Sequence, residues 1–548
     1  MIKAIRKSLP FILILIITFI FSCRKQKPEI TIEISPDPMA VPVANKTPRK
    51  ASVRIKGTND TSIKVRWSSE NSAIAKVTDD GLITGISVGE TNIIATLANG
   101  NGIAKGRLII YDTLDYKLRI TLKDKGPVKY SLSKPQDFLS ARAIAKRNKM
   151  SIAIDSADIP IASDYLSQIE KAGGKIVTQS KWLKTVSVQV SDQSFIEKFR
   201  ALPFVKEVAP IWLGKKDTTA YLKTLVNISF STAPRSVASP EYFGVAWDNI
   251  RQNNGQALHD SGYKGQGMEI AVIDAGFKDL MNNPILKNIN IKGSKSFIYE
   301  KFNPFNYGNH GVYVTSCMAT NKANSFVGTA PEAAYWLLMT EDEDTEFPVE
   351  EDYLVAALEY ADSVGANAAN ISLGYIGFDK SFPAYKFEDM NGNTAFASRG
   401  ANIAADKGLL VVVAAGNDRS WVGTPADAPG VLTVGGIDKN GNISSFSSYG
   451  ITIDQRVKPD VLALATGDAL VSLSGAYGSG NGTSFASPVT CGLATCLWQA
   501  YPKLSNKDII SVIRQSGNRY IAPLMPFGYG VADMQKAMQL AKALSESK

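Results

Sequence analysis

Short runs of alternating apolar and polar residues follow the N-terminal segment of the chain. Between residues 29 and 112 these runs include 52–55, 63–67 and 91–95, and Gly and Asn residues separate them. Alternation with a period of two predicts strands that are buried on one face. Residues 24–113 are therefore predicted to form a small β-sandwich.

The pattern changes to mixed strands and helices between residues 114 and 212. Strands are predicted at 116–122, 175–179, 185–190 and 204–209, and helices near 162–172 and at 192–201. The order strand, helix, strand, strand, helix, strand is that of a ferredoxin-like α+β unit. Residues 213–240 lose this periodicity and gain Lys, Thr, Ser and Pro, which indicates a linker that is easy to cut.

Continuous apolar strands alternate with helices in residues 241–548. The predicted strands lie at 268–274, 333–339, 366–373, 408–417 and 430–436. Strands that are apolar along their whole length are buried on both faces, so the predicted class is α/β, a parallel sheet with helices on both sides. In such sheets, functional groups gather beyond the C-terminal ends of the strands.

The first residues of the chain are typical of an export signal. Lys3, Arg6 and Lys7 precede an apolar run at 10–21 that is shorter than the roughly 20 residues of a membrane helix. The run ends in Ile-Phe-Ser-Cys at 20–23, which resembles a bacterial lipobox. Residues 1–23 are therefore predicted to be a lipoprotein signal peptide with a lipid on Cys23. The protein is expected in the cell envelope, in the periplasm or at the outer membrane.

Charge is distributed unevenly over the 548 residues. Residues 1–240 hold 37 Lys and Arg against 20 Asp and Glu, whereas residues 241–548 hold 23 against 31. A basic half predicts an acidic partner surface, and the nearest one is the acidic half of the same chain. Because few aromatic residues are interleaved and the chain is predicted to be exported, we expect no nucleic-acid partner.

Polar residues with catalytic potential end two of the predicted strands and begin two helices. Asp274 and Asn417 each end a strand, and His310 precedes small and β-branched residues that open a helix. The other histidine, His259, lies at a helix end before a glycine, which is a common structural position. Ser484 lies in NGTSFASP (481–488), where it could either cap a buried helix or act as a nucleophile.

Two enzyme classes are excluded by residue counts and by chain order. A zinc peptidase of the HExxH type needs two histidines on one helix, and this chain has two histidines in all, far apart. An α/β-hydrolase places its histidine after its serine, and no histidine follows Ser484. The order Asp, His, Ser remains.

Four segments carry a specific resemblance. IAVIDAGF, NHGVYVTSCMA, AAGN and NGTSFASPV resemble, in this order, the signature segments of subtilisin-like serine peptidases, and the resemblance covers about residues 241–540. One departure is Val312, where the family mostly has Thr. The resemblance implies a protein-cleaving catalytic domain in which Ser484 attacks, His310 transfers protons and Asp274 orients the histidine. It also implies an oxyanion hole formed by Asn417 and the backbone N–H of Ser484.

The same resemblance assigns the substrate cleft. The cleft walls are expected to contain Ser372, Leu373, Gly374, Ala414, Ala415 and Gly416, with Gly423 at the floor of the primary pocket. No acidic residue marks that pocket, so we expect it to accept apolar side chains. No cofactor is expected for the chemistry. Structural calcium is frequent in the family, but the sequence shows no clear set of ligands.

Resemblances extend to the preceding domains. Residues 67–97 resemble the bacterial immunoglobulin-like domains of the intimin and invasin type. The ferredoxin-like unit is similar to the inhibitory prodomain of subtilisin-like peptidases, which is removed by self-cleavage, here expected within 213–240. Such processing would separate the catalytic domain from the lipid-bearing N-terminus.

Two interpretations stay open. The acidic run at 341–352 is typical of a helix start, but it could also attract the basic prodomain and basic substrates. The whole chain could alternatively be an inert surface adhesion or scaffold protein that works through its immunoglobulin-like module. Hydrolysis that depends on Ser484 separates an enzyme from such a protein.

Overall fold

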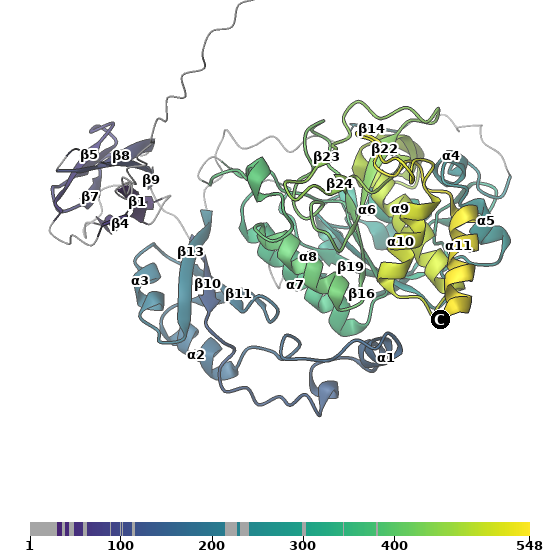
Figure 1. Cartoon of the computed structure of the whole chain (residues 1–548), viewed down its shortest axis with the longest axis horizontal. Coiled ribbons are helices and arrows are strands. Elements are labelled where there is room, and N and C mark those ends of the chain that lie inside the picture. The colour runs from purple at the N-terminus through teal and green to yellow at the C-terminus, as the bar shows by residue number, and fades with distance from the viewer. Residues whose placement is uncertain are drawn as a thin grey trace, which may run out of the picture.

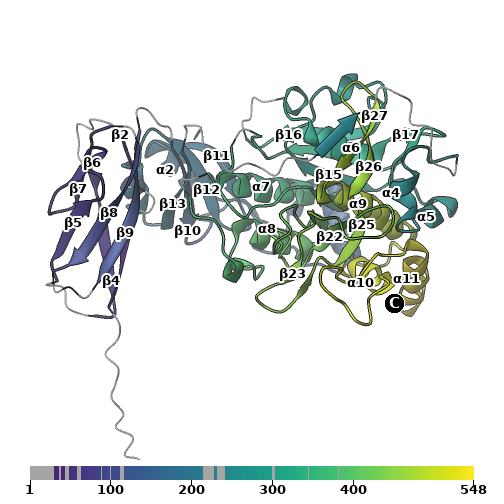
Figure 2. The same ribbon diagram turned by 90° about the horizontal axis from the view of Figure 1, so that it is seen from above.

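The computed structural model describes residues 30–35, 39–42, 49–58, 63–87, 89–98, 100, 102–111, 116–213, 227–230, 241–298, 303–343, 345–379 and 382–548. The predicted signal peptide with Cys23 and most of the predicted linker lie outside these residues. The described residues form a sandwich domain (30–111), a central domain (116–213) and a C-terminal domain (241–548), which lie in a row (Figures 1 and 2). Among these residues, no helix has both the length and the apolar character needed to cross a membrane.

The sandwich domain has the predicted β-sandwich fold. Its largest sheet has the order β2 (Met39–Pro42), β9 (Ile103–Tyr111), β8 (Gly89–Leu97) and β5 (Val65–Ser69). The other strands are β1 (Thr31–Ser35), paired with β4 (Ser52–Lys56), and β3 (Arg49–Lys50), β7 (Leu82–Gly85) and β6 (Ala75–Val77). Alternate strand residues such as Ile83, Ile93 and Ala95 are fully buried, as the period of two predicts.

The central domain has the ferredoxin-like order. Its elements are β10 (Tyr116–Leu122), α2 (Ser163–Lys171), β11 (Lys175–Ser180), β12 (Thr185–Val190), α3 (Phe195–Arg200) and β13 (Val205–Leu213). The antiparallel sheet has the order β11, β12, β10, β13. Strand β10 is therefore central in the sheet, and Leu118 and Ile120 on it are fully buried.

One part of the central domain was not predicted. Between β10 and α2 the chain forms η1 (Pro135–Asp137) and α1 (Ala141–Lys149), whose N-cap Ser140 accepts a hydrogen bond from the N–H of Ala143. We call residues 123–162 the arm. Figure 1 shows the arm leaving the sheet and running beneath the C-terminal domain, where α1 lies far from α2 and α3.

The C-terminal domain is built on a parallel sheet. Its order is β16 (Asn290–Ser296), β19 (Ala334–Met339), β15 (Glu269–Asp274), β20 (Ala368–Ile371), β21 (Leu410–Ala414), β22 (Leu432–Ile437) and β25 (Val461–Leu464). All six pairings are parallel. The five predicted strands are present. Strands β16 and β25 at the two edges were not predicted.

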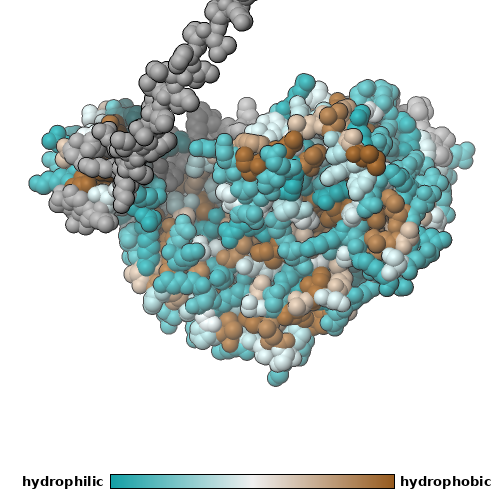
Figure 3. All heavy atoms as spheres, viewed as in Figure 1, coloured by the Kyte–Doolittle hydropathy of each residue, from teal (hydrophilic) through white to brown (hydrophobic). Residues whose placement is uncertain are grey.

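Helices cover both faces of this sheet. On β15, Ala271 and Ile273 share one core with α7 (Val349–Val364) and α8 (Phe396–Asp406). Ile270 and Val272 share the other core with α6 (His310–Ala319) and α9 (Thr483–Ala500). The remaining helices are α4 (Trp247–Arg251), α5 (Gln256–Asp260), α10 (Asn506–Ser516), α11 (Met534–Ser547), η2 (Leu280–Asn282), η3 (Pro304–Asn306) and η4 (Phe387–Asp389). Figure 3 shows hydrophobic residues in small groups among hydrophilic ones on the face of the molecule seen in Figure 1.

Short strands complete the fold, and one of them lies in the predicted linker. They are β14 (Asn227–Phe230), β26 (Thr466–Val471), β27 (Tyr477–Asn481), β17 (Asn321–Lys322), β18 (Phe326–Val327), β23 (Gly450–Ile451) and β24 (Val457–Lys458). Strand β14 pairs antiparallel with β27, which ends just before the helix that carries Ser484. Residues 227–230 are therefore part of a sheet, and the prediction of an irregular linker is wrong for them.

Candidate active site

Asp274 and His310 meet at the C-terminal edge of the parallel sheet. Asp274 is the last residue of β15 and is fully buried, and His310 is the first residue of α6. The Oδ1 atom of Asp274 accepts a hydrogen bond from the N–H of Ala275 and lies 2.8 Å from Nδ1 of His310. A carboxylate at this distance holds the proton on Nδ1, which leaves Nε2 to accept another.

Two glycines allow these segments to approach each other. A Cβ atom on Gly276 would lie 2.1 Å from the carbonyl oxygen of Tyr307, and one on Gly311 would lie 2.4 Å from the carbonyl oxygen of Gly276. Any larger residue at either position would force the loop after β15 away from the start of α6. The glycines that follow Asp274 and His310 in the sequence therefore determine how closely the two side chains lie.

Ser484 lies in the first turn of α9. The N-cap of this helix is Gly482, so the interpretation of Ser484 as a helix cap is wrong. The hydroxyl of Ser484 donates to the carbonyl oxygen of Ser372 at 3.3 Å, and the hydroxyl of Ser372 donates to the carbonyl oxygen of Ser484 at 2.8 Å. Asn370 donates to Ser372 and accepts from Ser487, so a buried polar network fastens the start of α9 to the end of β20.

Asn417 follows β21 at the same edge. Its Oδ1 atom accepts hydrogen bonds from the N–H of Thr483 at 2.9 Å and from the hydroxyl of Thr483 at 3.0 Å. These two bonds fix the carboxamide, so that Nδ2 is the group left to donate to a ligand. The orienting roles of Thr483 and Ser372 were missed in the sequence. Their signal was the position of Thr483 beside Ser484 and of Ser372 at the end of the strand predicted at 366–373.

His310, Asn417 and Ser484 line one cavity of about 430 Å³. All of the residues predicted to form the cleft walls and the pocket floor also line it, namely Ser372, Leu373, Gly374, Ala414, Ala415, Gly416 and Gly423. The cavity thus combines a largely apolar wall with a few polar groups, as ligand sites commonly do.

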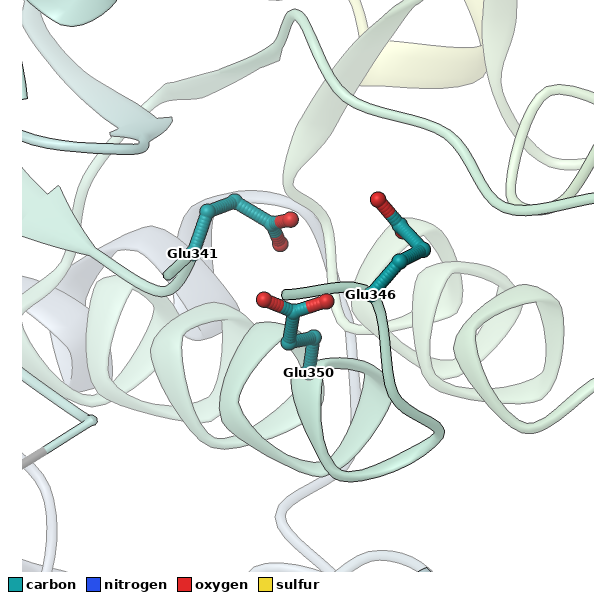
Figure 4. A group of neighbouring side chains, drawn as sticks. All are labelled: Glu341, Glu346 and Glu350. Atoms are coloured by element: carbon teal, nitrogen blue, oxygen red, sulfur yellow. The ribbon is translucent and has the colours of Figure 1, made fainter. Parts of the chain in front are cut away.

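Acidic residues line the same cavity. Glu341, Glu343 and Glu346 are among its lining residues. Figure 4 shows the side chains of Glu341, Glu346 and Glu350 next to one another, and one carboxylate oxygen from each lies within 4.8 Å of the others. Glu350 accepts from the backbone N–H groups of Asp342 and Phe347, which is helix-start chemistry, and Glu341 accepts from the hydroxyl of Tyr375. We assign no metal ion to this group.

The remaining histidine and the thiols have structural roles. His259 is buried, contacts the ring of Phe243 and has Nε2 at 3.0 Å from the carbonyl oxygen of Thr329. Burial lowers the pKa of His259, which favours the neutral ring. Cys317, Cys491 and Cys496 are free and buried, and burial raises the pKa of each thiol.

Comparison with known proteins gives three family matches. Residues 265–530 match the subtilase family, residues 117–221 match the Peptidase S8 propeptide domain of Bacteroidota, and residues 30–107 match the bacterial Ig-like domain of group 2. These matches cover the greater part of the C-terminal, central and sandwich domains in turn.

Individual relatives point the same way. Subtilisin NAT of Bacillus subtilis subsp. natto is 26% identical over 380 residues, which are 68% of this chain and 85% of that protein. Subtilisin of Bacillus pumilus is 28% identical over 53% of this chain and 98% of its own length. The thermophilic serine proteinase of Bacillus sp. strain AK1 is 30% identical over 53% of this chain and 63% of its own length. Residues 265–530 therefore form a serine endopeptidase domain of the subtilase family, preceded by a propeptide domain of that family and a bacterial Ig-like domain.

Proposed function

We propose that Ser484, His310 and Asp274 are the catalytic triad of this peptidase. Ser484 attacks the carbonyl carbon of the scissile peptide bond while Nε2 of His310 takes its proton. His310 then gives that proton to the leaving amine, and an acyl-enzyme remains on Ser484. Water, activated by the same histidine, hydrolyses the acyl-enzyme. Asp274 keeps the imidazole in the required tautomer through the 2.8 Å contact with Nδ1.

Asn417 and the backbone N–H of Ser484 complete the proposed mechanism as the oxyanion hole. The carboxamide of Asn417 is oriented by Thr483, the residue that immediately precedes the nucleophile. One hydrogen-bonded unit therefore positions both the donor and the nucleophile. The observation that carries the proposal is that the His310–Asp274 pair, Ser484 and Asn417 come together at a single cavity.

The central domain is proposed to act as an intramolecular inhibitor that is removed by self-cleavage within residues 213–240. The propeptide match supports this, as does the packing of the basic central domain against acidic α7, where Arg119 binds Asp352. We further propose that the protein is exported and anchored through a lipid on Cys23. Processing would then release the C-terminal domain from the membrane.

The test compares residues 24–548 of the wild type with the Ser484→Ala variant. We expect the wild type to shed a fragment that begins between 210 and 245 and to cut casein, whereas the variant stays whole and inactive. N-terminal sequencing locates the cut. If both proteins stay whole, and neither cuts casein after proteolytic removal of the N-terminal half, the proposal is wrong. The alternative of an inert adhesion protein would then be the better account.

A further inference from the structure

An exposed apolar loop lies between the last two helices of the chain, α10 and α11. We call residues 518–527 (Asn-Arg-Tyr-Ile-Ala-Pro-Leu-Met-Pro-Phe) the apolar loop, and residues 518–525 of it are all exposed. The side chain of Ile521 is 94% exposed and that of Leu524 is 56% exposed. Among the described residues, 11 large hydrophobic residues are exposed, and four of them lie within 520–525. Single exposed apolar residues are common on proteins, whereas a group of them marks an interaction surface.

Backbone hydrogen bonds hold the apolar loop in shape. The N–H of Arg519 donates to the carbonyl oxygen of Tyr529 at 3.0 Å, and the N–H of Leu524 donates to that of Gly528 at 3.2 Å. Gly528 has a left-handed φ of 59°, and a Cβ atom there would lie 2.0 Å from the carbonyl oxygen of Pro459. The base of the loop is therefore pressed against the domain, and the fold itself keeps the apolar side chains in water.

The apolar loop and the active-site cavity lie at opposite edges of the parallel sheet. The N–H of Tyr529 donates to the carbonyl oxygen of Asp460, the residue directly before β25. Val531 then runs parallel to β25, beside Leu462, so the loop extends beyond the N-terminal end of this strand. Because the strands of the sheet are parallel, their N-terminal ends share one edge. Asp274 ends β15 at the other edge.

Two cations lie beside the apolar side chains. A hollow of about 320 Å³ is lined by residues 517–522 and by Lys536 of α11, and its charged lining residues are Arg519 and Lys536. The guanidinium of Arg519 lies 4.1 Å from the centre of the Phe527 ring, which keeps this charge next to the apolar loop. Guanidinium and ammonium groups are the usual protein partners of phosphate. The hollow is therefore suited to a phosphate group.

The charge of the chain changes sign at this end. Residues 501–548 hold 7 Lys and Arg against 3 Asp and Glu, whereas residues 241–500 hold 16 against 28. Apolar and aromatic side chains next to cations are typical of segments that bind the surface of a membrane with anionic lipids. A bilayer also accepts a protruding tip without a cavity of matching shape. Charge and shape together favour a lipid surface as the partner of the apolar loop.

We propose that the apolar loop docks the C-terminal domain on a bilayer that contains anionic phospholipids. The four exposed apolar side chains enter the headgroup region, and Arg519 and Lys536 bind lipid phosphates. The inference goes beyond the function proposed above and does not depend on the triad. Because the cavity lies at the opposite edge of the sheet, it faces the water when the domain is docked. After a cut within 213–240, this reversible contact keeps the domain near the bilayer without its lipid anchor.

The experiment measures the binding of residues 24–548 with Ser484→Ala to lipid vesicles by sedimentation, at about 0.15 M salt. The vesicles consist of phosphatidylcholine, either alone or with about one third of anionic phosphatidylglycerol. We expect Ile521→Ser combined with Leu524→Ser to lower the partition coefficient on anionic vesicles at least about tenfold. Arg519→Gln combined with Lys536→Gln should lower it to a similar extent on anionic vesicles and leave it unchanged on neutral ones.

Matched controls change the same kinds of residue elsewhere. Ile103→Ser removes an isoleucine of the sandwich domain that is 67% exposed. Lys278→Gln combined with Lys439→Gln removes two exposed charges that follow β15 and β22, at the edge of the sheet opposite the apolar loop. Each control should change the partition coefficient by less than about twofold, because distant charges are largely screened at this salt concentration.

A dye on the apolar loop reports contact with lipid directly. Cys317, Cys491 and Cys496 are buried, so a thiol-reactive, polarity-sensitive dye should label a cysteine introduced by Ala522→Cys. We expect its emission to shift to the blue on anionic vesicles. The same dye at Asn440→Cys, an exposed position that follows β22, should not shift. This protein carries none of the loop substitutions above, so its result stands even where one of those variants is unstable.

Three results would overturn the inference. The first is equal binding by the parent and the Ile521/Leu524 variant. The second is sedimentation with vesicles while the dye at position 522 stays unchanged, which would assign binding to the basic N-terminal half. The third is a dye shift that appears without vesicles as the protein concentration rises, which would make a second copy of the chain the partner. A failed triad affects none of these results, because every protein carries Ser484→Ala.

Discussion

At Asn417 one end of the carboxamide is already occupied by Thr483. Both hydrogen bonds accepted by Oδ1 come from the residue before the proposed nucleophile, so Nδ2 is held in one orientation before any substrate binds. A donor fixed in advance loses no rotational freedom when negative charge develops on the substrate oxygen. Such groups stabilise the transition state more than the bound substrate.

This leads to a prediction for Asn417→Ala. We expect kcat to fall by about 10²- to 10³-fold with KM nearly unchanged, because the lost hydrogen bond forms mainly in the transition state. Steady-state hydrolysis of a peptide substrate by the processed enzyme measures both constants. A variant that raises KM and leaves kcat intact would instead place Asn417 in ground-state binding.

Glu351, near the start of α7, makes the stability of the protein depend on pH. Burial raises the pKa of Glu351 to about 7 from an ordinary value of 4.5, although Arg119 and hydrogen bonds from Ala397 and Tyr385 oppose the shift. Between these values the folded protein binds a proton that the unfolded chain has lost. The contribution of Glu351 to the free energy of unfolding therefore falls as the pH rises from 4.5 to 7, by about 3 kcal/mol in total.

Glu351→Gln should remove this dependence. In the Ser484→Ala background, we expect the variant to be more stable than its parent by up to about 3 kcal/mol at pH 8 and equally stable at pH 4.5. The glutamine oxygen can still accept from the N–H of Ala397, and its amide can donate to the hydroxyl of Tyr385. Thermal unfolding at both pH values measures the difference. Glu388→Gln, at an exposed position, is the control and should change neither.

At the level of elements, α7 is the main contact between the central and C-terminal domains. The guanidinium of Arg119 binds both carboxylate oxygens of Asp352, which is 3% exposed, and also packs over the ring of Phe396. Ser187 donates a further hydrogen bond to the same carboxylate at 2.7 Å. The basic half of the chain therefore contacts the acidic run at 341–352 through Asp352, the last residue of that run.

Arg119→Met should loosen the central domain. The variant leaves Asp352 buried without its cation. After a cut within residues 213–240, the protein concentration at which half of the central domain has dissociated from the C-terminal domain, which we call the half-dissociation concentration, is therefore expected to rise by at least about 100-fold. Size-exclusion chromatography over a dilution series measures this concentration. Arg200→Met, which removes a surface pair with Glu197 on the same domain, should change it less than about threefold. Comparable effects of the two variants would contradict the importance of the buried pair.

The elements that the sequence did not predict have physical reasons in common. Strand β16 (NIKGSKS) is an edge strand with mostly exposed or half-buried side chains, so it lacks the continuous apolar pattern of the central strands. Helix α1 contains few large apolar residues, and its basic side chains are neutralised by Asp362, which lies far away in the sequence. The residues that we propose to be catalytic could be located in the sequence because each one ends, follows or opens a strongly patterned element. The orienting role of Thr483 depends on a contact across 66 residues, which no local pattern contains.

At the level of the whole molecule, the uneven charge of the chain corresponds to an interface. Cations of the central domain face acidic residues of α7, and the contacts at Asp352 and Asp362 are almost completely shielded from water. The sandwich domain adds a half-buried ion pair between Arg49 and Asp192 of the central domain. Exposed charges outside these contacts add long-range attraction that salt can screen.

The dissociation of the processed complex should therefore respond only moderately to salt. Between 0.1 M and 1 M ionic strength the Debye length falls from about 10 Å to about 3 Å, which screens exposed charges but hardly affects buried pairs. We expect the half-dissociation concentration to rise by roughly three- to tenfold over this range, as measured by size-exclusion chromatography. A rise of several hundredfold would mean that exposed charges, and not the buried pairs, hold the two domains together.

The contacts of the central domain along α7 also depend on the spacing and the angle of three residues on this helix. Asp352, Glu359 and Asp362 fall on one side of the helix because seven residues are close to two full turns, and each one meets a different part of the central domain. Inserting a single residue between Asp352 and Glu359 would turn the later contacts by about 100° and move them by about 1.5 Å, while the proposed catalytic residues lie on other elements. A change in the length of this helix would therefore misalign the central domain along it even where the cavity that holds Ser484 is unchanged.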